Sequence, residues 1–314
     1  MAGTLIVSLD FELFWGMHDC VDLKQYAPNI IGGRKGIPKI LDLFRQFGIH
    51  ATWATVGMLF AKGPRELDTY LPKSLPTYDL KKLSPYPFLN TLEDGDPVYF
   101  APKLPGLISQ TPGQEIGSHT FCHYYCREAG QTISQFRQDM EAFKAIASDK
   151  GFRTESVVLP RNQSEPAYTE VLRELGFTSY RDEENDWIHE KVKFRPLMRA
   201  LRLADVYLPL TGHGCFTPKN EGGIVNIVGS RMYKPRFIAF LEPLKLRRIK
   251  KQMLYAAKHD LCFHLWWHPH NIGANTEYHL RQLEEIFRYY GELQETYGMR
   301  SLNMGELSRE ILDS

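Results

Sequence analysis

Two carboxylates stand two positions apart at the end of an apolar, strand-like run near the start of the chain. Residues 4–9 lead into Asp10 and Glu12, in the order Ser-Leu-Asp-Phe-Glu. Carboxylates at the end of such a strand are unfavourable if buried, unless a cation or a proton lies between them. The pair therefore indicates a site that holds a cation or, as the ordinary alternative, a solvated strand end.

A second cluster, residues 115–123, contains two histidines four positions apart, His119 and His123. One helical turn would place both imidazoles on the same face. Two imidazoles and one carboxylate make a three-ligand zinc site whose fourth position is open to water. Taken alone, this spacing also arises by chance or in a surface pair. Cys122 and Cys126 offer thiols that bind zinc too, but Cys122 would point away from the histidine face, so both are expected to be buried structural thiols.

The third cluster follows the apolar run 156–159. Arg161 and Asn162 stand at its end, and Asp186 with Trp187 comes one structural unit later. An arginine at a strand end is more often a partner in a surface ion pair than a catalytic group. This cluster alone therefore does not make Arg161 a catalytic residue, and the case for that role rests on the other clusters.

The fourth cluster, residues 262–271, holds three histidines and two tryptophans. Strand alternation places His264, Trp266 and His268 on one face. We interpret His264 as a core histidine behind the site and His268, at the strand end, as a functional residue. The tryptophans are candidates for the core, but sugar rings also stack on such side chains.

The elements that position these clusters alternate between apolar runs and segments of helical periodicity. Residues 40, 41, 44 and 47 share a helix face, with Pro38 near the start and Gly48 at the end, and Thr132 with Gln135 forms a capping box. Strand-like runs occupy residues 4–9, 50–56, 115–118, 156–159, 177–180, 224–228 and 261–266. This alternation predicts a parallel α/β fold, and α/β barrels carry catalytic residues at the carboxyl ends of their strands.

Residues 63–113 interrupt the alternation and contain nine of the nineteen prolines. A structureless loop of this length is uncommon unless it is functional or disordered. We expect a single domain over residues 1–314 with an ordered insertion at about 62–113. The insertion either covers the active-site mouth, where its aromatic rings would contact a sugar, or serves as a packing flap or oligomer contact.

The charge balance is nearly even, with 38 Lys+Arg against 37 Asp+Glu, and gives no indication of a nucleic-acid partner. The basic residues 245–251 are interpreted as a solvated helix face, with contact to anionic lipid or a phosphorylated substrate as the alternative. Five scattered cysteines argue against a disulfide framework. The N-terminus shows no secretion signal, and no run approaches the ~18 apolar residues of a transmembrane segment. We expect a cytoplasmic protein, with attachment to the inner face of the membrane and a homo-oligomer both left open.

Taken in order, the clusters resemble the motifs of the polysaccharide deacetylase family, the NodB homology domain of carbohydrate esterase family 4. The first motif of that family pairs a catalytic base with a metal-binding carboxylate, and Asp10 and Glu12 match these positions. The second motif, H-[ST]-x-x-H, matches His119 and His123. The aspartate usual in the first motif is replaced here by the longer Glu12, which would alter the distance to a metal.

The remaining motifs are matched less closely. Arg161 matches an arginine that orients the base, although the usual prolines after it are replaced by Asn162 and Gln163. Asp186 with Trp187 resembles the fourth motif, and His268 resembles the acid histidine of the fifth. The resemblance covers residues 4 to about 273, apart from the insertion.

The resemblance implies an α/β fold of the distorted (β/α) barrel type and metal-dependent removal of an N-acyl group, acetyl in the first instance, from an amino sugar. The substrate would be a nucleotide- or lipid-linked precursor of a surface polysaccharide. The implied site has Asp10, His268 and Arg161 as catalytic residues, Glu12, His119 and His123 as ligands of a divalent metal (zinc first), and Asp186, Trp187, Trp266, Asn162 and His270 as substrate-binding residues.

Three alternatives remain open. On the same fold, the protein would be a deformylase of a lipid-linked amino sugar or a metal-free cyclic amidohydrolase. In a different class, it would be a catalytically inactive sugar-binding module. Metal affinity separates these alternatives, since metal-dependent hydrolysis requires it.

Overall fold

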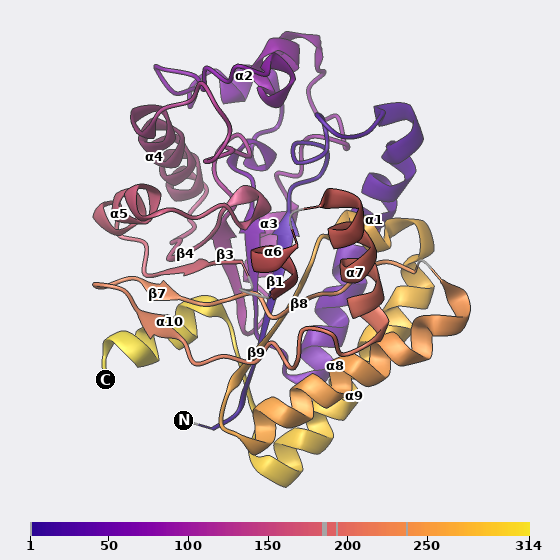
Figure 1. The fold of residues 1–314 in the computed structure, drawn as a ribbon. Helices are drawn as coiled ribbons and strands as arrows, with labels where there is room; N and C mark the ends of the chain where they lie inside the picture. Colours follow the sequence, from indigo (N-terminus) through magenta and orange to yellow (C-terminus); the bar gives the residue numbers. More distant parts are fainter. Residues whose placement is uncertain (1, 184–186, 193, 237) are drawn as a thin grey trace.

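The computed structural model describes residues 2–183, 187–192, 194–236 and 238–314, and Figure 1 follows the chain through them. Within these ranges one sheet of ten strands carries helices around it. The strands are β1 (Thr4–Phe11), β2 (Ala51–Thr55), β3 (Gln114–Ser118), β4 (Ser156–Val158), β5 (Ser179–Arg181), β6 (Lys219–Asn220), β7 (Val225–Asn226), β8 (Arg231–Met232), β9 (Cys262–Trp267) and β10 (Arg300–Leu302).

The sheet is parallel apart from one edge pair. Its strand order is β6-β7-β5-β4-β3-β2-β1-β9-β8, with β10 also paired to β1, and only β6 and β7 run antiparallel. In the described ranges the strand order ends at β6 and β8, so the sheet does not close on itself. It is curled into a half-barrel. Every residue of β1 is buried, as expected for a parallel strand covered on both faces. The predicted α/β class and the parallel sheet are confirmed.

Helix α8 (Glu242–Lys258) packs on α9 (Thr276–Tyr297), which also packs on α1 (Leu23–Phe47). At another side of the sheet, α4 (Ile133–Asp149) packs on α5 (Pro166–Glu174). No helix of the described residues is long and apolar enough to cross a membrane. The α-helices are α1 (Leu23–Phe47), α2 (Pro64–Leu67), α3 (Leu104–Ser109), α4 (Ile133–Asp149), α5 (Pro166–Glu174), α6 (Trp187–Lys191), α7 (Arg195–Tyr207), α8 (Glu242–Lys258), α9 (Thr276–Tyr297) and α10 (Met304–Leu312). The short 3-10 helices are η1 (Gly57–Phe60), η2 (Lys81–Leu83), η3 (Tyr86–Thr91), η4 (Pro160–Asn162), η5 (Ala239–Leu241) and η6 (Pro269–Asn275).

The start of α1 differs from its prediction. Gly48 ends the helix in the left-handed conformation as expected (φ 61°), but the helix begins far before Pro38, after its N-cap Asp22. The reason is tertiary, because α1 packs along η6. At Gly33 an added Cβ would lie 2.5 Å from the carbonyl oxygen of Pro269, so glycine allows the two backbones to touch. The packed interface outweighs the local preference of proline for a helix start.

The proline-rich insertion is built into the core. Tyr78, Tyr86, Tyr99 and Phe100 are all buried, with at most 8% of each residue exposed. The indole nitrogen of Trp15, in the turn after β1, donates to the carbonyl oxygen of Tyr99 at 2.8 Å. These contacts favour a packing segment over a lid, because the rings that would meet a sugar are already covered by protein.

Candidate metal centre and active site

Four of the predicted site residues meet at the carboxyl edge of the sheet. Asp10 lies near the end of β1 and Glu12 directly follows it. His119 follows β3 and His268 follows β9, and β1 is paired in parallel with β9 and, through β2, aligned with β3. Parallel strands bring their carboxyl ends to one edge, which is why residues far apart in sequence converge there.

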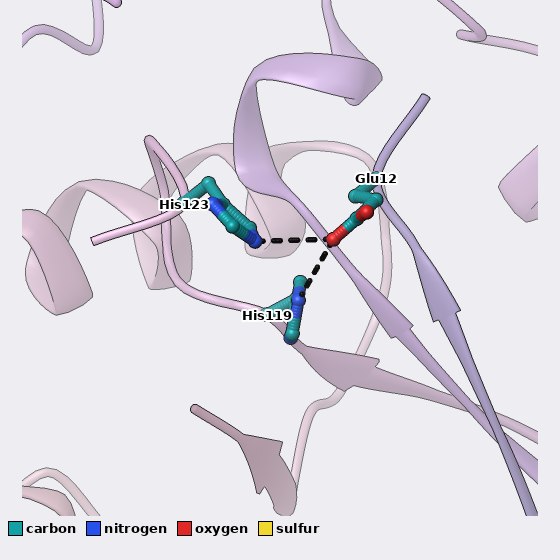
Figure 2. A group of neighbouring side chains, drawn as sticks. All are labelled: Glu12, His119 and His123. Carbon is teal, nitrogen blue, oxygen red and sulfur yellow. Dashed lines mark hydrogen bonds and ion pairs between the residues drawn. The ribbon is translucent and has the colours of Figure 1, made fainter. Parts of the chain in front are cut away.

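Glu12, His119 and His123 form a buried group whose ligand atoms all lie within 4.8 Å of one another. Figure 2 shows both imidazoles pointing at the carboxylate. Oε2 of Glu12 lies 3.3 Å from Nε2 of His119 and 3.0 Å from Nε2 of His123. Burial raises the pKa of Glu12, but His268 and His123 outweigh that effect and hold the pKa well below its ordinary value.

The hydrogen-bond geometry of His119 fits that of a metal ligand. Nδ1 of His119 lies 2.7 Å from the carbonyl oxygen of Val158. A carbonyl can only accept, so Nδ1 of His119 donates to it, and Nε2 is the ring nitrogen that faces Glu12 and is placed to bind a cation. A ring nitrogen that faces a buried carboxylate at this distance is favourable only when a cation or a proton lies between them. Two imidazole nitrogens and one carboxylate are also the donor set of an open zinc site.

The segment that carries the two histidines is a loop, so the predicted helical turn is wrong. Thr120 and His123 have left-handed backbones, with φ of 64° and 61°. Asp139 of α4 holds the loop from behind, accepting from the backbone N–H of Phe121 at 2.7 Å and of Cys122 at 3.2 Å. Burial raises the pKa of Asp139 to about 6. The imidazoles converge because the left-handed residues turn the chain back on itself.

The two cysteines beside this loop stay outside the metal group. Cys122 and Cys126 are free thiols, 1% and 2% exposed. Burial raises the pKa of both thiols well above the ordinary value, so they remain protonated. The expectation of buried structural thiols is confirmed.

Arg181, and not Arg161, contacts Asp10. Nη1 and Nη2 of Arg181 donate to the two carboxylate oxygens of Asp10 at 2.8 and 2.7 Å. Arg161 has a left-handed backbone (φ 58°) and pairs instead with Asp19 and Glu128, at 2.8 and 2.6 Å. The prediction that Arg161 orients Asp10 is therefore wrong. The missed signal was an arginine directly after the strand-like run 177–180, at the end of β5.

The electrostatics around Asp10 favour its ionised form. Burial raises the pKa of Asp10, but Arg181 and His268 outweigh burial and lower it below its ordinary value. Asn162, predicted to bind substrate, is buried and accepts from Nε of Arg181 at 2.9 Å. It therefore supports Arg181 as well as lining the cavity.

The three histidines His264, His268 and His270 differ in how deeply they are buried. Nε2 of His268 is 3.6 Å from Asp10 and 3.7 Å from Glu12, and its side chain is 19% exposed. His270 is buried, with Nε2 3.7 Å from Glu12, and burial lowers its pKa to about 3. His264 is fully buried and contacts Oγ of Ser8 at 2.8 Å, as expected for a core histidine.

A cavity of about 180 Å³ opens onto the group of Glu12, His119 and His123 and onto Asp10 and His268. Trp266 lines it, as does Gly16, where an added Cβ would come within 2.1 Å of the Glu12 carboxylate. Trp187 does not line it; 40% of this residue is exposed and its indole nitrogen donates to Leu210. Asp186 lies outside the described residues. The cavity is lined by Asp10, Glu12, Gly16, Met17, Cys20, His119, His123, Tyr125, Arg161, Asn162, Arg181, Trp266 and His268.

No protein-family model and no curated protein matches this chain. Similar solved structures include two that are provisionally named polysaccharide deacetylases. The one from Mycobacterium smegmatis has a TM-score of 0.60 at 10% identity, over 99% of this chain and 91% of that one. The one from Pseudomonas aeruginosa PAO1 has a TM-score of 0.56 at 12% identity, over 98% of this chain and 89% of that one.

A third similar structure is the Puue allantoinase, with a TM-score of 0.56 at 14% identity, over 100% of this chain and 91% of that one. At such identities the likeness is one of fold. The chain has the curled, distorted (β/α) barrel fold of the polysaccharide deacetylases, as the order of its motifs predicts.

Proposed function

We propose that the protein is a metal-dependent amidohydrolase that removes an N-acyl group, in the first instance acetyl, from an amino sugar. One observation carries the proposal: the buried group of Glu12, His119 and His123 shares a cavity with Asp10 and His268. A three-ligand site beside a carboxylate and an imidazole has the parts that amide hydrolysis requires. The names of the similar deacetylase structures support the same reaction class.

The divalent metal, for which zinc is our first expectation, would be held by Glu12, His119 and His123. When bound, it supplies Lewis-acid polarisation of the acyl carbonyl and lowers the pKa of water. Asp10, ionised and held by Arg181, accepts the proton of the attacking water. The acyl group leaves as a carboxylic acid.

His268 then protonates the departing amine nitrogen. The side chain of Asn271 accepts from the Tyr26 hydroxyl at 3.3 Å and lies 3.1 Å from Nδ1 of His268, which positions the imidazole ring. Nε2 of His268 faces Asp10 and Glu12, and from the imidazolium form it gives its proton to the amine and leaves a neutral ring. An amine leaves readily only when protonated, which is the step this proton supports.

The proposed substrate is a nucleotide- or lipid-linked amino sugar in the cytoplasm, a precursor of a surface polysaccharide. Trp266 supports a sugar, because an aromatic ring in the cavity wall offers a surface on which a sugar ring packs. His270 and Asn162 are proposed to shape the floor and wall of the site rather than to recognise the sugar directly, since both are buried.

A cyclic amide hydrolase is the second candidate, because one similar structure is an allantoinase. The test incubates metal-loaded protein with a panel of N-acyl amino sugars and with allantoin, and measures free amine and carboxylic acid. Release of both from a sugar, abolished by a chelator and restored by zinc, supports the proposal. Turnover of allantoin alone, unaffected by the chelator, would replace it with the second candidate.

A further inference from the structure

A second cavity, of about 240 Å³, lies next to the first. The two share three lining residues, Arg161, Asn162 and Trp266. The two cavities therefore adjoin at Trp266, so a group attached to a sugar in the first cavity would lie close to the second. This is the direction in which a group attached to the sugar can be recognised.

The lining of the second cavity contains more basic than acidic side chains. It includes four basic side chains, Arg161, Arg202, Arg231 and Lys234, against two carboxylates, Glu183 and Asp205. The carboxylate of Asp205 forms ion pairs with two arginines, Arg231 at 3.0 Å and Arg248 at 2.8 Å. Arg161 is paired as well, with Asp19 at 2.8 Å and with Glu128 at 2.6 Å.

Lys234 is the cation best placed to meet a ligand. In the described part of the chain, its ammonium group makes no hydrogen bond or ion pair, although its backbone oxygen accepts from Lys245 at 3.0 Å. Burial, together with the charges of Arg202 and Arg231, lowers the pKa of Lys234. An ammonium group held half-buried beside other cations is stabilised when an anion enters the cavity.

We propose that the second cavity is a subsite for an anionic group, a phosphate or a carboxylate, carried by the amino sugar whose amide is hydrolysed in the first cavity. Lys234 is the residue that determines this specificity. The inference rests on the proposed function for the position of the sugar, but the anion site itself is open to a separate binding test.

The test compares metal-loaded wild-type protein with Lys234→Met, Lys234→Arg and the control Lys39→Met, whose lysine pairs with Glu277 on the exposed surface. Calorimetric binding is measured for N-acetylglucosamine 1-phosphate and for N-acetylglucosamine. Lys234→Met should weaken binding of the phosphorylated sugar about tenfold to a hundredfold, the effect of losing one hydrogen bond to a charged group. Lys234→Arg and Lys39→Met should retain it, and binding of the neutral sugar should be unchanged.

The nature of the anion is distinguished by further probes: UDP-N-acetylglucosamine, a short prenyl-phosphate-linked N-acetyl amino sugar and an N-acetyl amino uronic acid. The probe whose affinity falls most in Lys234→Met identifies the source. Equal binding of neutral and phosphorylated sugars by wild type and Lys234→Met overturns the subsite, even if amine is released. Lysine-dependent binding without amine release from any probe would retain the subsite and overturn the proposed hydrolysis.

Discussion

The guanidinium group of Arg181 donates to both carboxylate oxygens of Asp10 in a buried, bidentate ion pair. The same guanidinium also donates to Ser8 and Asn162, at 2.8 and 2.9 Å. Its Cζ atom lies 4.2 Å from the centroid of the Trp266 ring. Arg181 thereby contacts the proposed base Asp10, Ser8 of β1, and Trp266, which lines both cavities.

Arg181→Lys should lower turnover by about tenfold to a hundredfold, the effect typical of removing a partner that orients a site residue. A lysine keeps the charge but cannot form two parallel hydrogen bonds to Asp10. The measurement is kcat in a variant shown by circular dichroism to be folded. Arg161→Gln is the comparison, because Arg161 pairs with Asp19 and Glu128 rather than with Asp10. A greater loss in Arg161→Gln than in Arg181→Lys would return the orienting role to Arg161.

Asp10→Asn should keep the bound metal while lowering turnover by about 10²–10⁴, the typical contribution of a general base. The amide side chain preserves the size of the carboxylate but cannot accept the water proton. Metal content and kcat are measured on the same preparation. Near-normal turnover with full metal would exclude Asp10 as the base.

His119→Ala and His123→Ala should each weaken zinc binding by more than the 10–100-fold typical of losing an outer partner of a metal ligand. Each change removes one of the three donors of the buried group. Zinc retained after dialysis against a competing chelator provides the measurement. Cys122→Ser is the matched control, because this thiol lies in the same loop but outside the group, and it should retain zinc. Strong zinc loss in the control would make Cys122 a ligand.

Replacing residues 62–111 by a short linker should abolish cooperative folding rather than merely narrow the substrate range. The insertion contributes buried aromatic rings to the core, so its removal uncovers them. As a finer test, Phe100→Ala should lower the free energy of unfolding by about 3–5 kcal/mol. Leu80→Ala, at a residue that is 53% exposed, should change it by less than about 0.5 kcal/mol. A folded deletion variant that loses activity only on large substrates would support a lid instead.

Acid should destabilise the protein partly through His279. This buried histidine contacts Tyr233, and burial lowers its pKa to about 4, against about 6.5 in an unfolded chain. As the pH falls from about 6.5 to 4, the unfolded state takes up a proton that the folded state does not, so stability is lost in that window. In His279→Gln the fall in Tm between pH 7 and pH 4.5 should be smaller than in wild type. An identical fall would show that His279 does not contribute.

Local sequence determined the parts of this protein that depend on short-range chemistry. Apolar runs of strand length predicted most of the longer strands, and Thr132 with Gln135 forms the expected capping box of α4. Parallel strands end at one edge of a sheet, so residue type and position at strand ends predicted one candidate site. The residues so predicted, Asp10, Glu12, His119 and His268, line one cavity.

Only the tertiary structure decided which side chains meet within that site. Asp10 and Arg181 are 171 positions apart, and Arg161 and Arg181 both stand at the ends of strand-like runs, so the local pattern could not choose between them. The left-handed backbone at Arg161 turns that side chain towards Asp19 instead. The loop around His123 likewise takes its shape from Asp139 on a separate helix. Side-chain direction depends on backbone conformation and on distant partners, and these exist only once the chain has folded.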